Sequence, residues 1–133
     1  MNQSLEINKK FHLAVENHKK NNFKIAEELY EEILKVYPNN PETNFLLGSL
    51  SLDTNNLGKA KFFLEKTIKI KPNNSHAQNN LGTVYSEIGE IHKAKKCYEK
   101  AIEIEPSLAE AHSNLGKKFK ELGELKEAIN CFQ

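Results

Sequence analysis

The chain of 133 residues contains neither arginine nor tryptophan, and its 19 basic residues are all lysines. Arginine is the side chain that binds phosphate or carboxylate with a planar, two-pronged donor. The lysines are balanced by 18 acidic residues, so the formal net charge is only +1. Because there is no strong positive field to attract polyanions, we expect neither nucleic acid nor a membrane surface as a partner.

Cysteine is scarce, with only Cys97 and Cys131. Two such widely separated thiols make neither a disulfide scaffold nor the closely spaced ligand pairs of a zinc site. The five histidines never stand three or four residues apart, so we expect no metal centre. The first twenty residues lack the continuous apolar run of a signal peptide or membrane span. We predict one cytoplasmic domain over residues 1–133.

Motifs of catalysis are also missing from the sequence. It has no glycine-rich phosphate loop, no nucleophile elbow and no pattern of paired carboxylates in a pocket. We therefore predict that the chain is not an enzyme and needs no cofactor.

What the sequence does contain is a repeat of 34 residues. Three columns recur with this spacing: a leucine followed by glycine or alanine, then an alanine, then a proline. The leucines are Leu13, Leu47, Leu81 and Leu115, the alanines Ala26, Ala60, Ala94 and Ala128, and the prolines Pro38, Pro72 and Pro106. Agreement of independent columns on one period indicates a stacked structural repeat.

Further columns predict where helices end and how they pack. Asparagine or glycine tolerates the left-handed conformation that ends a helix, and one column holds Asn21, Asn55, Gly89 and Gly123. We expect a turn at each of these residues, in the middle of every repeat. The glycines that follow the leucines are expected to let the second helix approach closely, and they are Gly48, Gly82 and Gly116.

These columns resemble the tetratricopeptide repeat family, whose pattern is Leu-Gly and an aromatic in the first helix, Ala-aromatic-Ala in the second and a closing proline. Residues 75–108 match best, through Leu81, Gly82, Tyr85, Ala94, Tyr98, Ala101 and Pro106. The resemblance implies an all-α fold, a right-handed superhelical solenoid of antiparallel helix hairpins with about 3.7 repeats. The predicted repeats are residues 7–40, 41–74, 75–108 and a truncated 109–133.

In this family the first helices line a concave groove. Carried onto this chain, the resemblance predicts a peptide-binding groove that changes from apolar to amide-rich along the sequence. Its residues are Phe11, His12, Val15, Phe45, Leu46, Ser49, Asn79, Asn80, Thr83, Asn114 and Lys117. The clamp that holds chaperone tails in some relatives needs arginine, so a bound carboxylate tail is not expected.

The string AEAHSNLGKKFKELGELKEAINCF is similar to the superhelical region of O-linked N-acetylglucosamine transferases, where stacked asparagines hold the backbone of a bound chain. Asn80 and Asn114 match that ladder, whereas His12 and Leu46 break it. An amide both donates and accepts, so it can bind a peptide unit of any sequence. The alternative is that these asparagines hydrogen-bond within the repeat stack.

The predicted function is a protein-protein interaction scaffold that binds a peptide segment of a partner in the groove. One alternative is the N-terminal substrate-recognition arm of a larger transferase-type enzyme. A second alternative is a self-association module, in which copies of the chain form a homo-oligomer through the last repeat. That unit is expected to lack a covering helix over Phe119, Leu122, Ile129 and Phe132.

Overall fold

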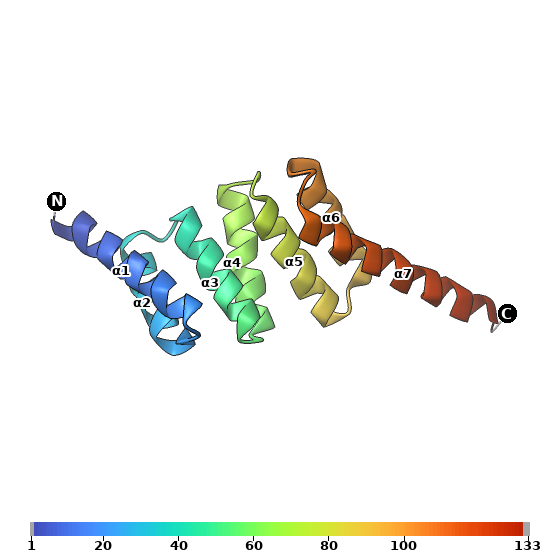
Figure 1. Cartoon of the computed structure of the whole chain (residues 1–133), viewed down its shortest axis with the longest axis horizontal. Helices are drawn as coiled ribbons and strands as arrows, with labels where there is room; N and C mark the ends of the chain where they lie inside the picture. Colours follow the sequence, from blue (N-terminus) through green and yellow to red (C-terminus); the bar gives the residue numbers. More distant parts are fainter. Residues whose placement is uncertain (1, 132–133) are drawn as a thin grey trace. The chain divides into compact units, whose positions relative to one another are not determined.

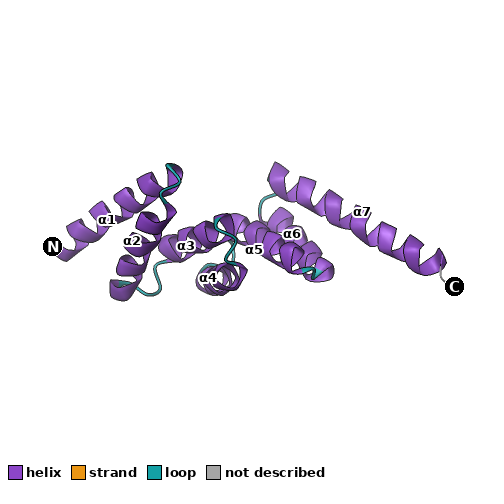
Figure 2. Cartoon of the chain, turned by 90° about the horizontal axis from the view of Figure 1, so that it is seen from below, coloured by secondary structure: helices purple, strands orange, loops and turns teal. Residues whose placement is uncertain are grey.

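The structure, a computed structural model, describes the backbone of residues 2–131 and the side chains of residues 3–126. All regular secondary structure in this part of the chain is helical, which confirms the predicted all-α class (Figures 1 and 2). The helices are α1 (Asn2–Lys19), α2 (Phe23–Val36), α3 (Pro41–Asp53), α4 (Leu57–Ile70), α5 (Ser75–Ile88), α6 (Ile91–Ile104) and α7 (Ala109–Cys131).

The helices form two compact units, Met1–Pro72 and Asn73–Gln133, which we call unit 1 and unit 2. Unit 1 contains the hairpins α1–α2 and α3–α4, and α2 packs against α3. Unit 2 contains the hairpin α5–α6 followed by α7. The last helix packs mainly against α6 and touches α5 at fewer places.

Three of the four predicted turns have the expected backbone. Asn21, Asn55 and Gly89 have φ values of 65°, 60° and 94°, in the left-handed region that ends a helix. They connect α1 to α2, α3 to α4 and α5 to α6. The turn predicted at Gly123 is wrong, because α7 continues through this residue to Cys131.

Local sequence does not determine whether a first helix ends at this column or continues through it. The same Gly-Glu pair ends α5 at residues 89–90 and stays helical at 123–124. The difference lies in packing. On α5, Tyr98 of α6 covers Gly82, whereas nothing lies within 4 Å of the position that a Cβ on Gly116 would take. A glycine inside a helix costs only about 1 kcal/mol relative to alanine. Without a second helix packed on Gly116, continuing the helix costs less than breaking it.

The predicted close approach of the second helix to a glycine of the first is confirmed at Gly48 and Gly82. A Cβ on Gly48 would lie 2.9 Å from Cγ of Leu64, and one on Gly82 would lie 2.6 Å from Cε1 of Tyr98. Only a residue without a side chain permits this contact between the two helices of a hairpin. The same prediction for Gly116 is wrong.

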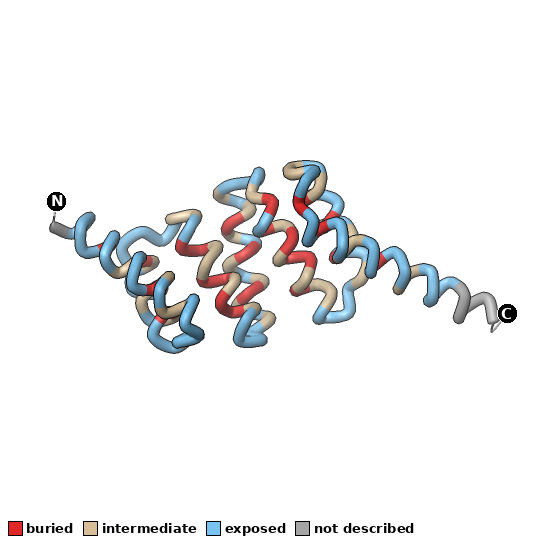
Figure 3. Tube along the Cα trace, viewed as in Figure 1, coloured by how far each residue is buried: buried red, intermediate tan, exposed pale blue. Residues whose placement is uncertain are grey.

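The core of unit 1 surrounds a buried tyrosine. Tyr30 is fully buried, and its neighbours in the core are Ala14, Ala26, Leu47 and Leu50 from three helices. Figure 3 shows that buried positions alternate with exposed ones along the helices. The hydroxyl of Tyr30 lies 3.1 Å from Nδ1 of His18, and Nε2 of the same imidazole lies 3.0 Å from Oδ2 of Asp53. His18 thus links α1 to both α2 and α3. Burial raises the pKa of Tyr30 to about 12.

Two polar residues that lie three positions before the repeat leucines Leu47 and Leu115 also stabilise the fold. Asn44 donates from Nδ2 to the carbonyl oxygen of Pro38 over 3.0 Å, and Nε2 of His112 lies 2.7 Å from the carbonyl oxygen of Pro106. Both side chains therefore bond the residue six positions earlier. The bonds fasten the closing proline of one repeat to the first helix of the next.

An N-terminal cap fixes the start of α3, and its removal should be measurable. The side chain of Asn40 accepts a hydrogen bond from the backbone N–H of Thr43 over 2.9 Å, immediately before Pro41. Asn40→Ala should lower the free energy of unfolding by about 1 kcal/mol in urea denaturation. Asn22, at the start of α2, makes no such side-chain bond, so Asn22→Ala is the matched control with a smaller loss. Equal losses from both variants would contradict the assignment of the cap.

Candidate functional site

The predicted groove residues of unit 1 lie on the first helices of its two hairpins. They are Phe11, His12 and Val15 on α1 and Phe45, Leu46 and Ser49 on α3. Only His12 is exposed, and the others are half-buried. Val15 and Leu46 pack against the core around Tyr30. Four of these six side chains are apolar, and two of the four, Val15 and Leu46, belong to the core as well as to the predicted groove.

The predicted groove residues of unit 2 lie on α5 and α7, and the structure brings two of them into direct contact. Nδ2 of Asn114 donates to Oδ1 of Asn79 over 3.1 Å, which joins the two helices and is the bond within the repeat stack that the alternative for Asn114 predicts. Asn79 is buried, Asn80, Thr83 and Asn114 are half-buried, and Lys117 is exposed. The hydroxyl of Thr83 lies 3.1 Å from the hydroxyl of Tyr98. Unit 2 therefore presents a mostly uncharged polar surface.

A buried lysine beside this surface was not predicted from the sequence. Lys118 is only 6% exposed, and its Nζ lies 2.5 Å from Oγ of Ser86 and 2.8 Å from Oε1 of Glu121. In the two preceding repeats the same column holds Val84 and Leu50, which are both buried and apolar, whereas the first repeat has the exposed Glu16. The available signal was a charged residue that follows two apolar ones in its column, with a glutamate three positions later. Its contact with Ser86 adds a second bond between α5 and α7.

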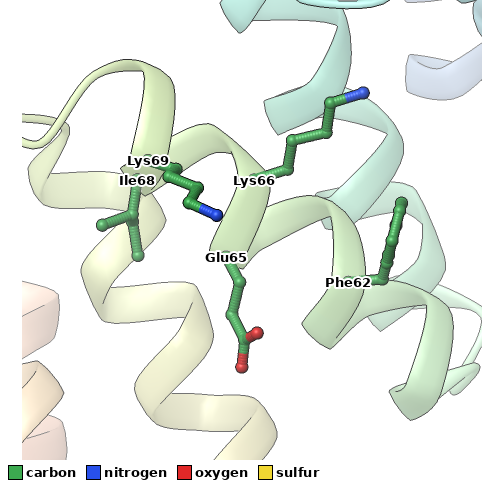
Figure 4. Close-up of a pocket in the computed structure, with 5 residues that line it drawn as sticks. All are labelled: Phe62, Glu65, Lys66, Ile68 and Lys69. Carbon is green, nitrogen blue, oxygen red and sulfur yellow. The ribbon is translucent and has the colours of Figure 1, made fainter.

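A second surface feature is a pocket along α4, away from the predicted groove residues. It is lined by Phe62, Glu65, Lys66, Ile68 and Lys69. Figure 4 shows that these side chains leave the helix in different directions and do not converge on one point. A site for a small molecule needs convergent polar groups, so this pocket is a weak candidate.

Among the residues that the structure describes, no group of three or more histidine, cysteine, aspartate or glutamate residues could hold a metal ion. None of the helices that the structure describes is both long and apolar enough to cross a bilayer.

Tetratricopeptide repeat models match residues 18–83, 76–108 and 97–130. The chain belongs to the tetratricopeptide repeat family. The predicted resemblance is thus confirmed over most of the sequence. The match at residues 76–108 covers the hairpin α5–α6, in the repeat that fits the family pattern best.

Solved structures share the fold of this tetratricopeptide repeat protein. A mutant O-GlcNAc transferase of Thermobaculum terrenum superposes with a TM-score of 0.83 at 24% identity, covering 89% of this chain. The match spans only 23% of that transferase chain. The first tetratricopeptide domain of Spaghetti (RPAP3), solved with an HSP90 peptide, gives a TM-score of 0.85 at 20% identity, covering 90% of this chain and 95% of that one.

A third solved structure, MamA, is 28% identical with a TM-score of 0.78, and the match covers 88% of this tetratricopeptide repeat chain and 68% of that one. No curated protein sequence matches the chain. The comparisons therefore establish an all-α helical repeat fold.

Proposed function

We propose that this tetratricopeptide repeat protein is an interaction scaffold that binds an extended peptide segment of a partner protein on the α5–α7 surface of unit 2. The observation that carries the proposal is the hydrogen bond from Asn114 to Asn79, 3.1 Å long, between two successive first helices. It holds the half-buried amide of Asn114 in one orientation. Pre-organised side chains lose less entropy when a ligand binds.

The chemistry of Asn114 suits a peptide backbone. Its bond to Asn79 uses one of the two amide protons, which leaves a donor and the carbonyl acceptor of the side chain. A peptide unit offers the complementary N–H and C=O groups. Each bond contributes about 0.5–1.5 kcal/mol net, so a ligand needs several such contacts along the surface. Asn80 and Thr83, half-buried on α5, are the further polar contacts that we propose.

The solved complex of the Spaghetti domain with an HSP90 peptide supports a peptide as the class of partner for this fold. The mode of binding proposed here is different. Lys117 is the single cation among the predicted groove residues of unit 2, and the chain has no arginine. We therefore infer contacts to the backbone of a segment rather than to a terminal carboxylate.

A direct test uses a peptide selected on the wild-type chain by phage display, with its affinity measured by titration calorimetry. Asn114→Ala should weaken binding by about 2- to 10-fold, because one or two backbone contacts are lost. Asn73→Ala, which truncates an exposed asparagine in the loop before α5, should leave the affinity unchanged. Methylating the backbone nitrogens of the peptide should weaken binding more than replacing its side chains with alanine. Unchanged affinity of the Asn114 variant would refute the proposal.

A second candidate function is the substrate-recognition arm of a larger transferase-type enzyme. It is supported by the superposition on the O-GlcNAc transferase, of which this chain spans 23%. In that case the α5–α7 surface would bind the polypeptide that is modified. The gene sequence after codon 133 tests this candidate, since a catalytic domain must follow in the same reading frame.

A further inference from the structure

Two hydrogen bonds cross from α7 to α5, and both start from residues on one face of α7. Nδ2 of Asn114 donates to Oδ1 of Asn79, and Nζ of Lys118 donates to Oγ of Ser86 over 2.5 Å. The two donors are about one helical turn apart on α7, and the two acceptors are about two turns apart on α5. The members of each pair therefore lie on the same side of their helix. The two bonds hold α7 against α5 at two separate places.

A lysine is an unusual residue for the buried position that Lys118 occupies. Its side chain is only 8% exposed, and the same column holds the buried residues Val84 and Leu50 in the two preceding repeats. Removing an ammonium group from water costs free energy, and an apolar side chain in the same space has no such cost. The fold buries an apolar residue at this column in α3 and α5. Stability alone therefore does not explain the lysine, and the groups that its ammonium holds in place are the better explanation.

The ammonium group of Lys118 is held from two sides. Ser86 of α5 accepts one hydrogen bond, and Oε1 of Glu121, about one turn further along α7, accepts another over 2.8 Å. The side chain of Glu121 is partly exposed, so its carboxylate stays in contact with water while it neutralises the lysine. Glu121 and Lys118 belong to the same helix, so of these two bonds only the one to Ser86 ties α7 to α5. We call these three side chains the Lys118 bridge.

Unit 1 joins its own first helices at the same two columns. His18 precedes Ser86 by 68 positions, twice the 34-residue period, and Asp53 precedes Glu121 by the same interval. In unit 1, Nε2 of His18 lies 3.0 Å from Oδ2 of Asp53, so the imidazole reaches the carboxylate directly. A serine is shorter than a histidine, and in unit 2 the ammonium group of Lys118 lies between Ser86 and Glu121 and bonds both. Contact between successive first helices at these columns is therefore a repeated feature of the fold.

We propose that Lys118 is a positioning residue of the peptide-binding surface, which holds α7 at the distance from α5 that orients Asn114. The inference rests on the function proposed above and names a residue that acts on that site without touching the peptide. A single contact between Asn114 and Asn79 leaves the two helices free to rotate about it. A second contact, further along both helices, prevents this rotation. Asn114 then presents its remaining donor and its carbonyl oxygen in one direction before a peptide binds.

The first test observes Asn114 itself, without any peptide. NMR measures how fast the side-chain amide proton that bonds Asn79 exchanges with water. Lys118→Met keeps a long side chain but removes the ammonium group, so the bond should open more often and exchange should become about 2- to 10-fold faster. Ser86→Ala, which removes the partner on α5, should have the same effect. Ser86→Thr keeps a hydroxyl at the same atom and should leave the exchange rate near that of the wild type.

The second test measures the affinity of the peptide selected on the wild-type chain by titration calorimetry. Lys118→Met and Ser86→Ala should each weaken binding about 2- to 10-fold, because the peptide must now order Asn114 when it binds. Both changes break the same bridge, so the double variant should bind no more weakly than either single variant. The urea midpoint of Lys118→Met should be unchanged or higher, because methionine is apolar and the partly exposed Glu121 can be hydrated. A role in stability alone would lower this midpoint and leave the affinity unchanged.

The control is Lys96→Met, which makes the same change at an exposed position of α6 and should alter neither the exchange rate nor the affinity. If Lys118→Met and Ser86→Ala also altered neither, the inference would be overturned. Weaker binding with unchanged exchange at Asn114 would overturn it as well, because Lys118 would then contact the peptide directly. The proposed function fails separately: Asn114→Ala would leave the affinity unchanged, while faster exchange in Lys118→Met would still show that the bridge positions Asn114.

Discussion

Replacing Gly82 with alanine is expected to lower the free energy of unfolding by about 1–3 kcal/mol, the usual cost of inserting a methyl group into a packed core. The added Cβ would lie 2.6 Å from Cε1 and 2.8 Å from Cδ1 of Tyr98. The ring of Tyr98 is buried and its hydroxyl lies 3.1 Å from that of Thr83, so it has little freedom to move aside. The α5–α6 hairpin must open to accommodate the methyl group.

The same substitution at Gly116 should have the opposite sign. Gly116 occupies the same column, but it is exposed within α7 and a Cβ there would meet no atom within 4 Å. Alanine is a better helix former than glycine, so Gly116→Ala should raise stability by about 0.5–1 kcal/mol. Urea denaturation of dilute protein, followed by circular dichroism, measures both changes. If both variants shifted the midpoint in the same direction, the packing difference between the two glycines would be disproved.

The contrast between these glycines shows how far a repeat pattern predicts structure. Turns at Asn21, Asn55 and Gly89 were predictable because backbone tolerance of positive φ is a local property of the residue. The continuous helix through Gly123 was not, because it depends on whether a second helix packs on α7. A sequence column states which conformations a residue permits. The neighbouring element decides which of them is adopted.

The candidate site shows the same division between local and long-range information. The column of Asn80 and Asn114 was readable from the 34-residue period. The hydrogen bond from Asn114 to Asn79 was not, because it joins residues that are 35 positions apart and depends on the distance between α5 and α7. Lys118 is a stronger case, since the two preceding repeats have a buried apolar residue in its column. Its burial depends on Ser86 of α5, which the packing of α7 brings within hydrogen-bonding distance, and on Glu121, which lies one turn along the same helix.

Histidine gave the least information at the level of sequence. The spacing of the five histidines argued against a metal site but did not reveal what any of them does. In the structure, His18 joins Tyr30 and Asp53, residues 12 and 35 positions away in the chain. An imidazole with two ring nitrogens can bond two partners in opposite directions, which suits a residue placed between three helices. Its structural role therefore follows from the contact of α1 with α2 and α3.

The largest loss of stability is expected from Tyr30→Ala, at about 3–5 kcal/mol, as for other large aromatic residues truncated in a core. Tyr30 is fully buried, and its removal leaves a cavity among Ala14, Leu47 and Leu50, which belong to two different hairpins. Small residues such as Ala14 cannot extend to fill that space. Thermal or urea unfolding measures the loss. The control is Tyr37→Ala, because Tyr37 is 42% exposed and its truncation should change stability by about 0.5 kcal/mol or less.

Tyr30→Phe separates the two contributions of this side chain. Phenylalanine fills the same volume but removes the hydroxyl that lies 3.1 Å from Nδ1 of His18. The expected loss is about 1 kcal/mol, the net value of one hydrogen bond. Most of the effect of Tyr30→Ala must then come from lost packing. If Tyr30→Phe were as damaging as Tyr30→Ala, the contact with His18, rather than the filled core, would hold the two hairpins of unit 1 together.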